Sequence, residues 1–150
     1  MAGLYFEEFS VGRVFDHAWT RTVTEMDNVL YSSLTMNVQP LHLDEEFASK
    51  TEFGQRIVNS LFTLGLMIGM QVSDMTVGTT IANLGMSDVK FPNPLFENDT
   101  VRATTKVISK RESKSRPNAG IVEFHHQAFK QDGKLVAECH RQAFMLKKPA

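Results

Sequence analysis

One stretch of the chain is apolar on almost every face that a helix presents. It runs from Ser60 to Met75 and carries no charge from Leu61 to Ser73. A helix that is hydrophobic all round must be covered on all sides, and this stretch is too short and too interrupted by polar and glycine residues to span a bilayer. We therefore predict a buried central helix with Ser60 as its N-cap, whose first N–H groups favour negative charge.

Segments rich in β-branched and aromatic residues predict strands on both sides of this helix. Asp132-Gly133 predicts a two-residue hairpin turn between the last two. The predicted strands are Val14–Thr24, Thr79–Phe91, Thr100–Arg111, Gly120–Gln131 and Lys134–Lys147. This order predicts one α+β domain over residues 1–150, in which a curved antiparallel sheet of about five strands wraps around a central apolar helix, the hot-dog arrangement.

A helix is predicted directly after the first strand. Thr24 followed by Asp27 resembles a capping box with Asp in place of Glu. Apolar residues follow with helical spacing at Met26, Val29, Leu30 and Leu34. The helix should stop before Asn37, because the Gln39-Pro40 pair forces an extended or turn conformation.

The polar segment from Asn37 to Asp44 is therefore expected to be a loop, held by Pro40 beside the central helix. Asp44 is an N-cap candidate for a short helix that ends near Gly54. His42 is the one histidine outside the predicted strands, and its side chain can give or take a proton near neutral pH. The alternative is a histidine that caps a helix or satisfies a backbone carbonyl, and the residues alone leave both open.

Composition adds few constraints. Charged residues are 22%, hydrophobic residues 42% and the net charge is −1, which is ordinary for a soluble globular protein and favours neither nucleic acid nor an acidic membrane as a partner. The single cysteine, Cys139, excludes an internal disulfide and fits a reducing compartment. Residues 1–9 lack the basic and apolar pattern of a secretory signal, so we expect a cytoplasmic protein.

Three motifs resemble the MaoC-like, (R)-specific enoyl-CoA hydratase family. Asn37-x-Gln39-Pro40-Leu41-His42-x-Asp44 is similar to its Asp-x-Asn-Pro-Ile-His-x-Asp signature. Arg56-Ile-Val-Asn-Ser60-Leu is similar to its Arg-Ile-Ala-His-Gly-Met at the start of the hot-dog helix. Asn83-Leu-Gly85, with the Phe91–Asp99 segment after it, is similar to its Leu-Gly and Pro-Val-x-x-Gly-Asp elements. The three motifs occur in the family's order.

The resemblance implies syn addition of water across the α,β double bond of an acyl-CoA thioester, or the reverse, with no cofactor beyond the CoA thioester substrate. His42 would serve as acid and base. The Ser60 N–H, helped by that of Leu61, would hold negative charge on the thioester oxygen. The resemblance also implies a homodimer or higher homo-oligomer that carries the acyl chain between subunits.

The chain departs from the family at two of these positions. Asn37 stands where the family has its catalytic Asp, and Ser60 stands where it has glycine. An amide can orient a water, but it cannot take its proton. Either His42 alone suffices, or another carboxylate enters the site, or the protein binds acyl-CoA without hydrating it. We favour the first, with Asn37 as the holder of the water, because His42, Pro40 and Asp44 remain in place.

Relatives with similar Gln-Pro-Leu-His loops include hydratases of branched five-carbon dicarboxylic acyl-CoAs such as mesaconyl- or itaconyl-CoA. Their extra carboxylate needs a cation, and Arg56 and Arg116 are candidates. Alternatively, Arg116 and Lys114 face the CoA phosphates, or they belong to a solvated basic loop between strands. The candidate substrate-binding residues are Gln39, Pro40, Arg56, Asn59, Leu61, Gly85 and Arg116.

Counting back from the predicted hairpin turn places His125 opposite His140. Two such histidines could hold a metal, but the pattern supplies no third ligand, and we assign no metal site. A rival enzyme is a thioesterase of the same fold, which usually needs a carboxylate near the helix start that Asn59-Ser60 does not supply. A rival of another class is a non-catalytic acyl-CoA-binding or regulatory protein, which Asn37 favours.

Overall fold

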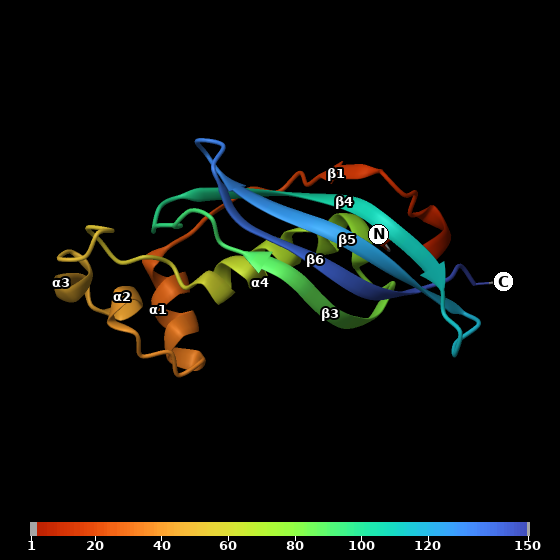
Figure 1. Cartoon of the computed structure of the whole chain (residues 1–150), viewed down its shortest axis with the longest axis horizontal. Coiled ribbons are helices and arrows are strands. Elements are labelled where there is room, and N and C mark those ends of the chain that lie inside the picture. Colours follow the sequence, from red (N-terminus) through yellow and green to blue (C-terminus); the bar gives the residue numbers. More distant parts are fainter. Residues whose placement is uncertain (1–2, 150) are drawn as a thin grey trace.

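The computed structural model describes residues 3–149. Its single antiparallel sheet has the strand order β1-β4-β5-β6-β3, with β2 also paired to β4, and it curves around helix α4 (Figure 1). The strands are β1 (Val14–Asp16), β2 (Arg21–Thr22), β3 (Thr80–Lys90), β4 (Thr100–Glu112), β5 (Ala119–Lys130) and β6 (Leu135–Leu146). The last four begin and end within one residue of the predicted bounds.

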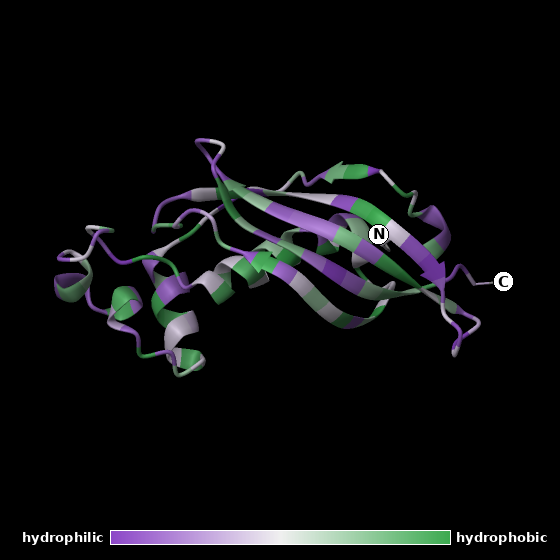
Figure 2. Cartoon of the chain, viewed as in Figure 1, coloured by the Kyte–Doolittle hydropathy of each residue, from purple (hydrophilic) through white to green (hydrophobic). Residues whose placement is uncertain are grey.

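Alternation along these strands explains why they were predictable. In β5, Val122, Phe124 and Ala128 are buried on the face toward α4, while Glu123 and His125 between them are partly exposed. Figure 2 shows the same alternation of hydrophobic and hydrophilic residues along the strands. A side-chain period of two places one set of residues in the core and the other on the outer face.

The first predicted strand, Val14–Thr24, is broken in two. β1 and β2 both pair with β4; the His17 N–H still donates to the Ala103 carbonyl, and the chain leaves the ladder only after it. His17 is buried and bonds to Asp74 and Thr105 across the core. The predicted strand is thus interrupted directly after this buried polar residue.

The helices fall between β2 and β3. They are α1 (Glu25–Leu34), α2 (Pro40–Leu43), α3 (Glu45–Ala48), α4 (Ser60–Met70) and the π-helix η2 (Val72–Thr76), with a 3-10 turn η1 (Phe6–Glu8) before the sheet. The capping box of Thr24 and Asp27 is confirmed, and the Asp44 side chain caps α3 at Phe47 N–H. The predicted loop from Asn37 to Asp44 contains one helical turn, because Pro40 at the first helical position presets the backbone. α3 ends at Ala48, before Gly54.

The inward face of α1 is polar. Met26, Leu30 and Leu34 are 68%, 51% and 74% exposed, whereas Asn28 and Ser32 are fully buried. The apolar spacing correctly predicted a helix, but the hydrogen bonds of Asn28 and Ser32 hold the opposite face against α4.

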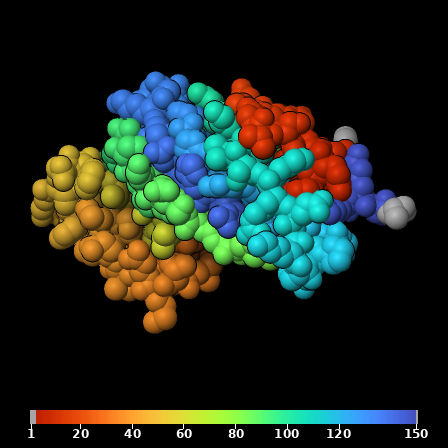
Figure 3. Space-filling model, turned by 45° about the vertical axis from the view of Figure 1, so that its right-hand side comes forward, coloured from red at the N-terminus to blue at the C-terminus, as the bar shows by residue number. Residues whose placement is uncertain are grey.

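The N-cap of helix α4 lies one residue before the predicted position. Asn59, not Ser60, is the N-cap, and its side-chain oxygen accepts the Leu61 N–H at 3.1 Å. The sheet covers Thr63, Met67 and Met70, but Leu61 is 54% exposed. Figure 3 shows atoms of this helix (yellow-green) at the surface between α1 and β3. The prediction that α4 is covered on all sides is therefore wrong for one chain. Within residues 3–149, every helix falls short of the length and apolar character that a membrane crossing demands.

The hairpin between β5 and β6 has a three-residue loop instead of two. Lys130 N–H donates to the Lys134 carbonyl, and Gly133, at φ +84°, closes the turn onto Lys130. An irregularity beyond Ala128 shifts the register back by one residue. The two deviations cancel, so His125 does pair with His140 as predicted.

Candidate active site

A cavity of about 290 Å³ lies at the N-terminal end of α4. Ile57, Ser60 and Thr63 line it from the helix side, and the Phe91–Leu95 segment lines it from the other. The Asn93 side chain donates to the Leu135 carbonyl at 2.8 Å, which anchors that second wall to the sheet. Apolar walls with a few polar groups suit an acyl chain whose polar end is recognised at the helix start.

His42 is 9% exposed and does not itself line this cavity, but it contacts Ile57, which does. Its Nδ1 is 2.9 Å from the carbonyl oxygen of Ile57, a residue that lines the cavity. A carbonyl can only accept, so Nδ1 carries the proton. The other ring nitrogen, Nε2, then holds a lone pair and has no partner among the described residues. Of the two alternatives that the sequence left open, the structure shows the carbonyl-bonded histidine, and the role of His42 as a base stays a prediction.

The start of α4 supplies a hydrogen-bond donor. Because the Asn59 side chain occupies the Leu61 N–H, the predicted help of Leu61 to an oxyanion is not available in this structure. The Ser60 N–H has no acceptor within residues 3–149, and Ser60 lines the cavity. Backbone N–H groups at a helix start favour negative charge through the helix dipole, typically by about 0.3–1 kcal/mol.

The loop residues before His42 have local partners. The Asn37 side-chain oxygen accepts the Gln39 N–H at 3.2 Å, forming a turn that leads into α2. Gln39 is the N-cap residue of α2, and its carbonyl accepts the His42 N–H at 3.0 Å. Asn37 and Gln39 therefore shape the backbone that presents His42, with Pro40 between them at the first helical position.

Arg56, one of the two arginines predicted to bind a substrate carboxylate, already has carboxylate partners within the chain. Arg56 forms ion pairs with Glu25 (2.6 Å), Glu45 (3.2 Å) and Glu97 (3.5 Å). These contacts, with the Glu25 hydrogen bond first, raise the pKa of Arg56. Because three carboxylates already balance its charge, Arg56 joins α1 and α3 to the segment before β4, and we leave it out of the substrate-binding set.

Arg116 lies far from His42 within one chain. It belongs to the connection between β4 and β5, at the opposite end of the sheet from α1–α3 (Figure 1). Its guanidinium stacks over the Phe144 ring at 5.6 Å. Gly85 is likewise away from the cavity, on β3 beside His140 and Glu123. Within one chain, Asn28 links His42 to Asn59, the residue before Ser60, whereas Arg116 and Gly85 lie elsewhere.

The remaining histidines are engaged elsewhere. His125 and His140 stack on the outer face of the sheet, with ring centroids 4.8 Å apart, and bond to Glu138 and Glu123 respectively. Among residues 3–149, no three His, Cys, Asp or Glu side chains are grouped so that they could hold a metal ion. Burial raises the pKa of Cys139 to about 11, which makes its thiol a poor nucleophile.

A polar row crosses the core between two apolar clusters. Arg141 Nε donates to His126 Nε2 at 3.0 Å, His126 Nδ1 lies 2.8 Å from the Thr105 hydroxyl, and that hydroxyl lies 2.8 Å from His17 Nε2. His17 Nδ1 is 3.1 Å from Asp74. Arg141 can only donate, so His126 carries its proton on Nδ1. Both nitrogens of each histidine are therefore occupied.

Sequence reasoning missed Asn28 and Ser32, which contact Asn59. Their signal was their spacing of four residues, which places two small polar side chains on one face of α1. Beside a stripe of larger apolar residues, that signal was overlooked.

Similar proteins point to one kind of chemistry. The chain is 32% identical over 97% of its length to a protein of Chloroflexus aurantiacus named beta-methylmalyl-CoA dehydratase. It is 30% identical over 98% of its length to a mesaconyl-CoA hydratase of Cereibacter sphaeroides. The chain spans only 41% and 42% of the length of these two relatives.

Solved structures agree on the fold. A structure described as a monoamine oxidase regulatory protein from Archaeoglobus has a TM-score of 0.87 and 35% identity, and the match covers 99% of this chain and 98% of that one. A Mycobacterium tuberculosis protein described as a double hot-dog fold has a TM-score of 0.88 and 22% identity, with 98% of this chain and 45% of that one covered. The fold is thus the hot-dog fold. Since the family model for the MaoC like domain also matches residues 7–128, the chain belongs to the MaoC-like domain family.

Proposed function

We propose that the protein is a hydro-lyase that adds water to the α,β double bond of an enoyl-CoA thioester, or removes it from the 3-hydroxyacyl product. The observation that carries this proposal is the state of His42, a histidine whose Nδ1–H is held by the Ile57 carbonyl while Nε2 keeps its lone pair. A histidine in this state can take a proton without a carboxylate partner.

In the proposed reaction, His42 Nε2 takes a proton from water as the water oxygen bonds to the β carbon. The electrons of the double bond move toward the thioester, and the Ser60 N–H stabilises the negative charge on its oxygen. The imidazolium then gives its proton to the α carbon, which restores neutral His42. One group acting from one side accounts for syn addition, and the Ile57 carbonyl accepts Nδ1–H throughout.

Asn37 takes the place of a carboxylate in this scheme. Its Oδ1 already accepts the Gln39 N–H, and a second lone pair remains to accept a hydrogen from the attacking water. The proposed reaction needs no cofactor besides the CoA thioester substrate, and acyl-CoA, not nucleic acid, is the proposed partner in a cytoplasmic setting.

We propose a branched five-carbon dicarboxylic acyl-CoA as one substrate class, because two relatives are named for methylmalyl- and mesaconyl-CoA. With Arg56 balanced by glutamates, the substrate carboxylate needs another cation. Arg116 would reach the cavity only from a second copy of the chain, since the β4–β5 connection to which it belongs lies at the far end of the sheet (Figure 1).

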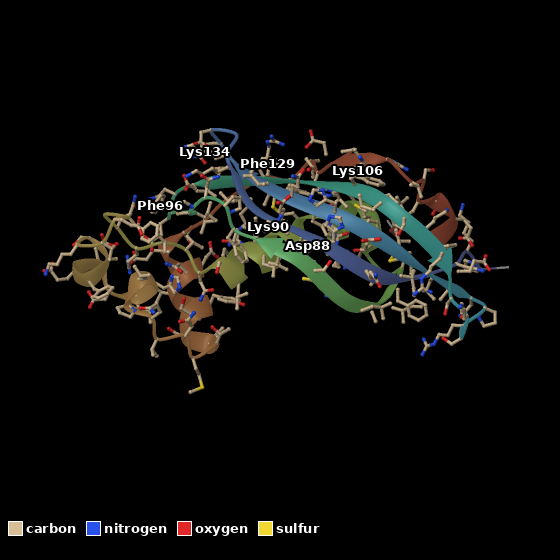
Figure 4. All side chains as sticks on the ribbon, in the orientation of Figure 1. Asp88, Lys90, Phe96, Lys106, Phe129 and Lys134 are labelled. Atoms are coloured by element: carbon tan, nitrogen blue, oxygen red, sulfur yellow. The ribbon has the colours of Figure 1, made fainter. Side chains whose placement is uncertain are left out.

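A homodimer or larger homo-oligomer is part of the proposal. Strand β3 has one neighbour, β6, and so leaves an unpaired edge. Asp88 and Lys90 stand near the end of this edge strand (Figure 4), and the exposed Leu61 of α4 lies on the side that the sheet does not cover. The same edge strand leaves the apolar side chains of Leu84, Met86 and Val89 exposed, and exposed apolar residues on a free edge are typical of a surface that pairs with another subunit. Light scattering after gel filtration measures the mass.

One assay separates the candidate functions. Incubation with crotonyl-CoA and with mesaconyl-CoA should lower the absorbance of the conjugated thioester without freeing thiol. Release of thiol would indicate a thioesterase instead. Binding of acyl-CoA with neither change would favour a non-catalytic protein, a reading supported by Asn37 at the position of the family's Asp.

A further inference from the structure

Asn28 on α1 is fully buried and contacts both parts of the candidate site. Its side-chain nitrogen donates to the carbonyl oxygens of His42 at 3.2 Å and Ile57 at 3.1 Å. Its side-chain oxygen accepts the N–H of Asn59 at 2.9 Å. Carbonyls only accept and a backbone N–H only donates, so these partners fix which way the amide points.

Each of these bonds reaches a group with a role in the proposed reaction. The Ile57 carbonyl is the one that accepts His42 Nδ1–H and thereby leaves Nε2 as the base. The bond to the His42 carbonyl holds the backbone of the same residue. Asn59 is the N-cap of α4 and directly precedes Ser60. One amide thus ties the imidazole to the helix start.

Ser32, one turn after Asn28 on α1, also contacts the start of α4. The Asn59 side chain accepts the Leu61 N–H through its oxygen and donates to the Ser32 hydroxyl at 3.2 Å through its nitrogen. Asn28 and Ser32 together therefore hold both the backbone and the side chain of the α4 cap. No charged side chain takes part in these contacts, so they hold their geometry without changing the charge of the site.

We infer that Asn28 is a positioning residue that holds His42 and the Ser60 N–H in register for the same acyl thioester; this inference rests on the proposed function. Only an amide of this length offers two donors and one acceptor here, since aspartate lacks the donors and leucine lacks all three. A misplacement of about 1 Å between reacting groups can cost roughly 100-fold in rate.

The test uses Asn28→Leu, which keeps the shape and removes all three bonds, and Asn28→Asp, which keeps the acceptor for the Asn59 N–H. In both folded variants kcat should fall about 10- to 100-fold, while KM changes less than about threefold. Nitrogen NMR of the His42 ring should show the Nδ1–H tautomer in the unmodified protein and a mixture of tautomers in the variants.

Thr76→Val is the matched control. Thr76 is also buried, and its hydroxyl donates to the Gln71 side chain at 3.2 Å, beyond the C-terminal end of α4. Loss of that bond should lower the melting temperature without altering kcat or the His42 spectrum. A fall in kcat for this control as large as that of the Asn28 variants would overturn the inference, because any lost buried bond would then have the same effect.

An unchanged His42 tautomer together with kcat within twofold of the unmodified protein in a folded Asn28 variant would also overturn it. If Asn28→Leu fails to fold, Asn28→Asp alone decides. If the unmodified protein hydrates no acyl-CoA, the proposed function fails separately. The NMR readout then decides whether Asn28 sets the state of His42.

Discussion

A comparison of His42 with the two histidines of the polar row, His17 and His126, shows that the burial of a histidine does not by itself indicate its role. His42, at the start of α4, uses one ring nitrogen on a backbone carbonyl and leaves the other without a partner among the described residues. His17 and His126, in the polar row of the core, have partners at both nitrogens. His126 is more deeply buried than His42. The number of occupied ring nitrogens, more than the depth of burial, separates the proposed base His42 from the histidines of the polar row.

The comparison predicts that His42→Ala has the largest effect on activity. Loss of the general acid and base should lower kcat about 100- to 10,000-fold, because no described carboxylate takes its place. The melting temperature should change little, since the side chain gives up a single hydrogen bond to Ile57. Turnover of crotonyl-CoA or mesaconyl-CoA measures the rate, and survival of activity would show that His42 is not the base.

His126→Leu should show the opposite pattern. It removes the acceptor of Arg141 Nε and leaves a buried guanidinium, which is 4% exposed, without its partner. The free energy of unfolding should fall by about 3 kcal/mol or more. Urea denaturation measures this loss. Activity measured well below the melting temperature should stay within about threefold, and a collapse of kcat in the folded variant would break the distinction between the two sets.

Asn37→Asp tests whether a carboxylate at this position increases the activity of the proposed site. A carboxylate at this position can share the proton transfers that the amide cannot. We expect about a tenfold or greater rise in kcat/KM on simple enoyl-CoAs, equivalent to about 1.4 kcal/mol of barrier. Steady-state kinetics on crotonyl-CoA, with Asn118→Asp as a control in the distant β4–β5 connection, tests it. A fall in activity would mean that the amide is required and that the family's Asp cannot be restored.

The polar row also predicts a dependence of stability on pH. Burial, and next the charge of Arg141, lower the pKa of His126 well below its ordinary value of 6.5. Below about pH 6.5, His126 therefore binds a proton in the unfolded chain but stays neutral in the folded protein. The stability contributed by neutral His126 is fully present above that pH and is lost as the pH falls, by up to about 1.4 kcal/mol per pH unit.

Denaturant titrations from pH 7.5 to 5 measure this slope. His126→Gln keeps an acceptor for Arg141 and a donor for Thr105 but does not titrate, so it should flatten the slope by as much as one proton. His140→Gln, on the outer face of the sheet, is the matched control. An equal slope in the unmodified protein and in His126→Gln would show that His126 takes no part.

Much of the fold was predictable because its signals are local. The last four strands follow from alternation, and the caps at Thr24 and Asp44 follow from side chains three residues from the N–H groups they bind. The hairpin shows the limit of this reasoning. The loop length was wrong, yet the predicted pairing of His125 with His140 was right, because a compensating irregularity beyond Ala128 lies outside what turn chemistry describes.

The candidate site was predictable in part. The resemblance pointed to His42 and Ser60, which the structure places at the same end of α4, but Arg56 and Arg116 have other partners or another location. The ion pairs of Arg56 were not predictable because its three glutamates come from separate segments of the chain. Asn28 was missed because an asparagine in a helix gives no pattern until its partners are known.

By itself, the amino-acid sequence determined the strand pattern, the presence of one apolar helix and the residue types available for acid–base chemistry. These depend on neighbours within a few positions, where propensity, capping and side-chain period act. Only the tertiary structure decided which face of α1 is buried, which nitrogen of His42 carries the proton and what holds the start of α4. Those outcomes depend on single hydrogen bonds between residues 14 to 31 positions apart, and no local pattern encodes which of the many polar groups will meet.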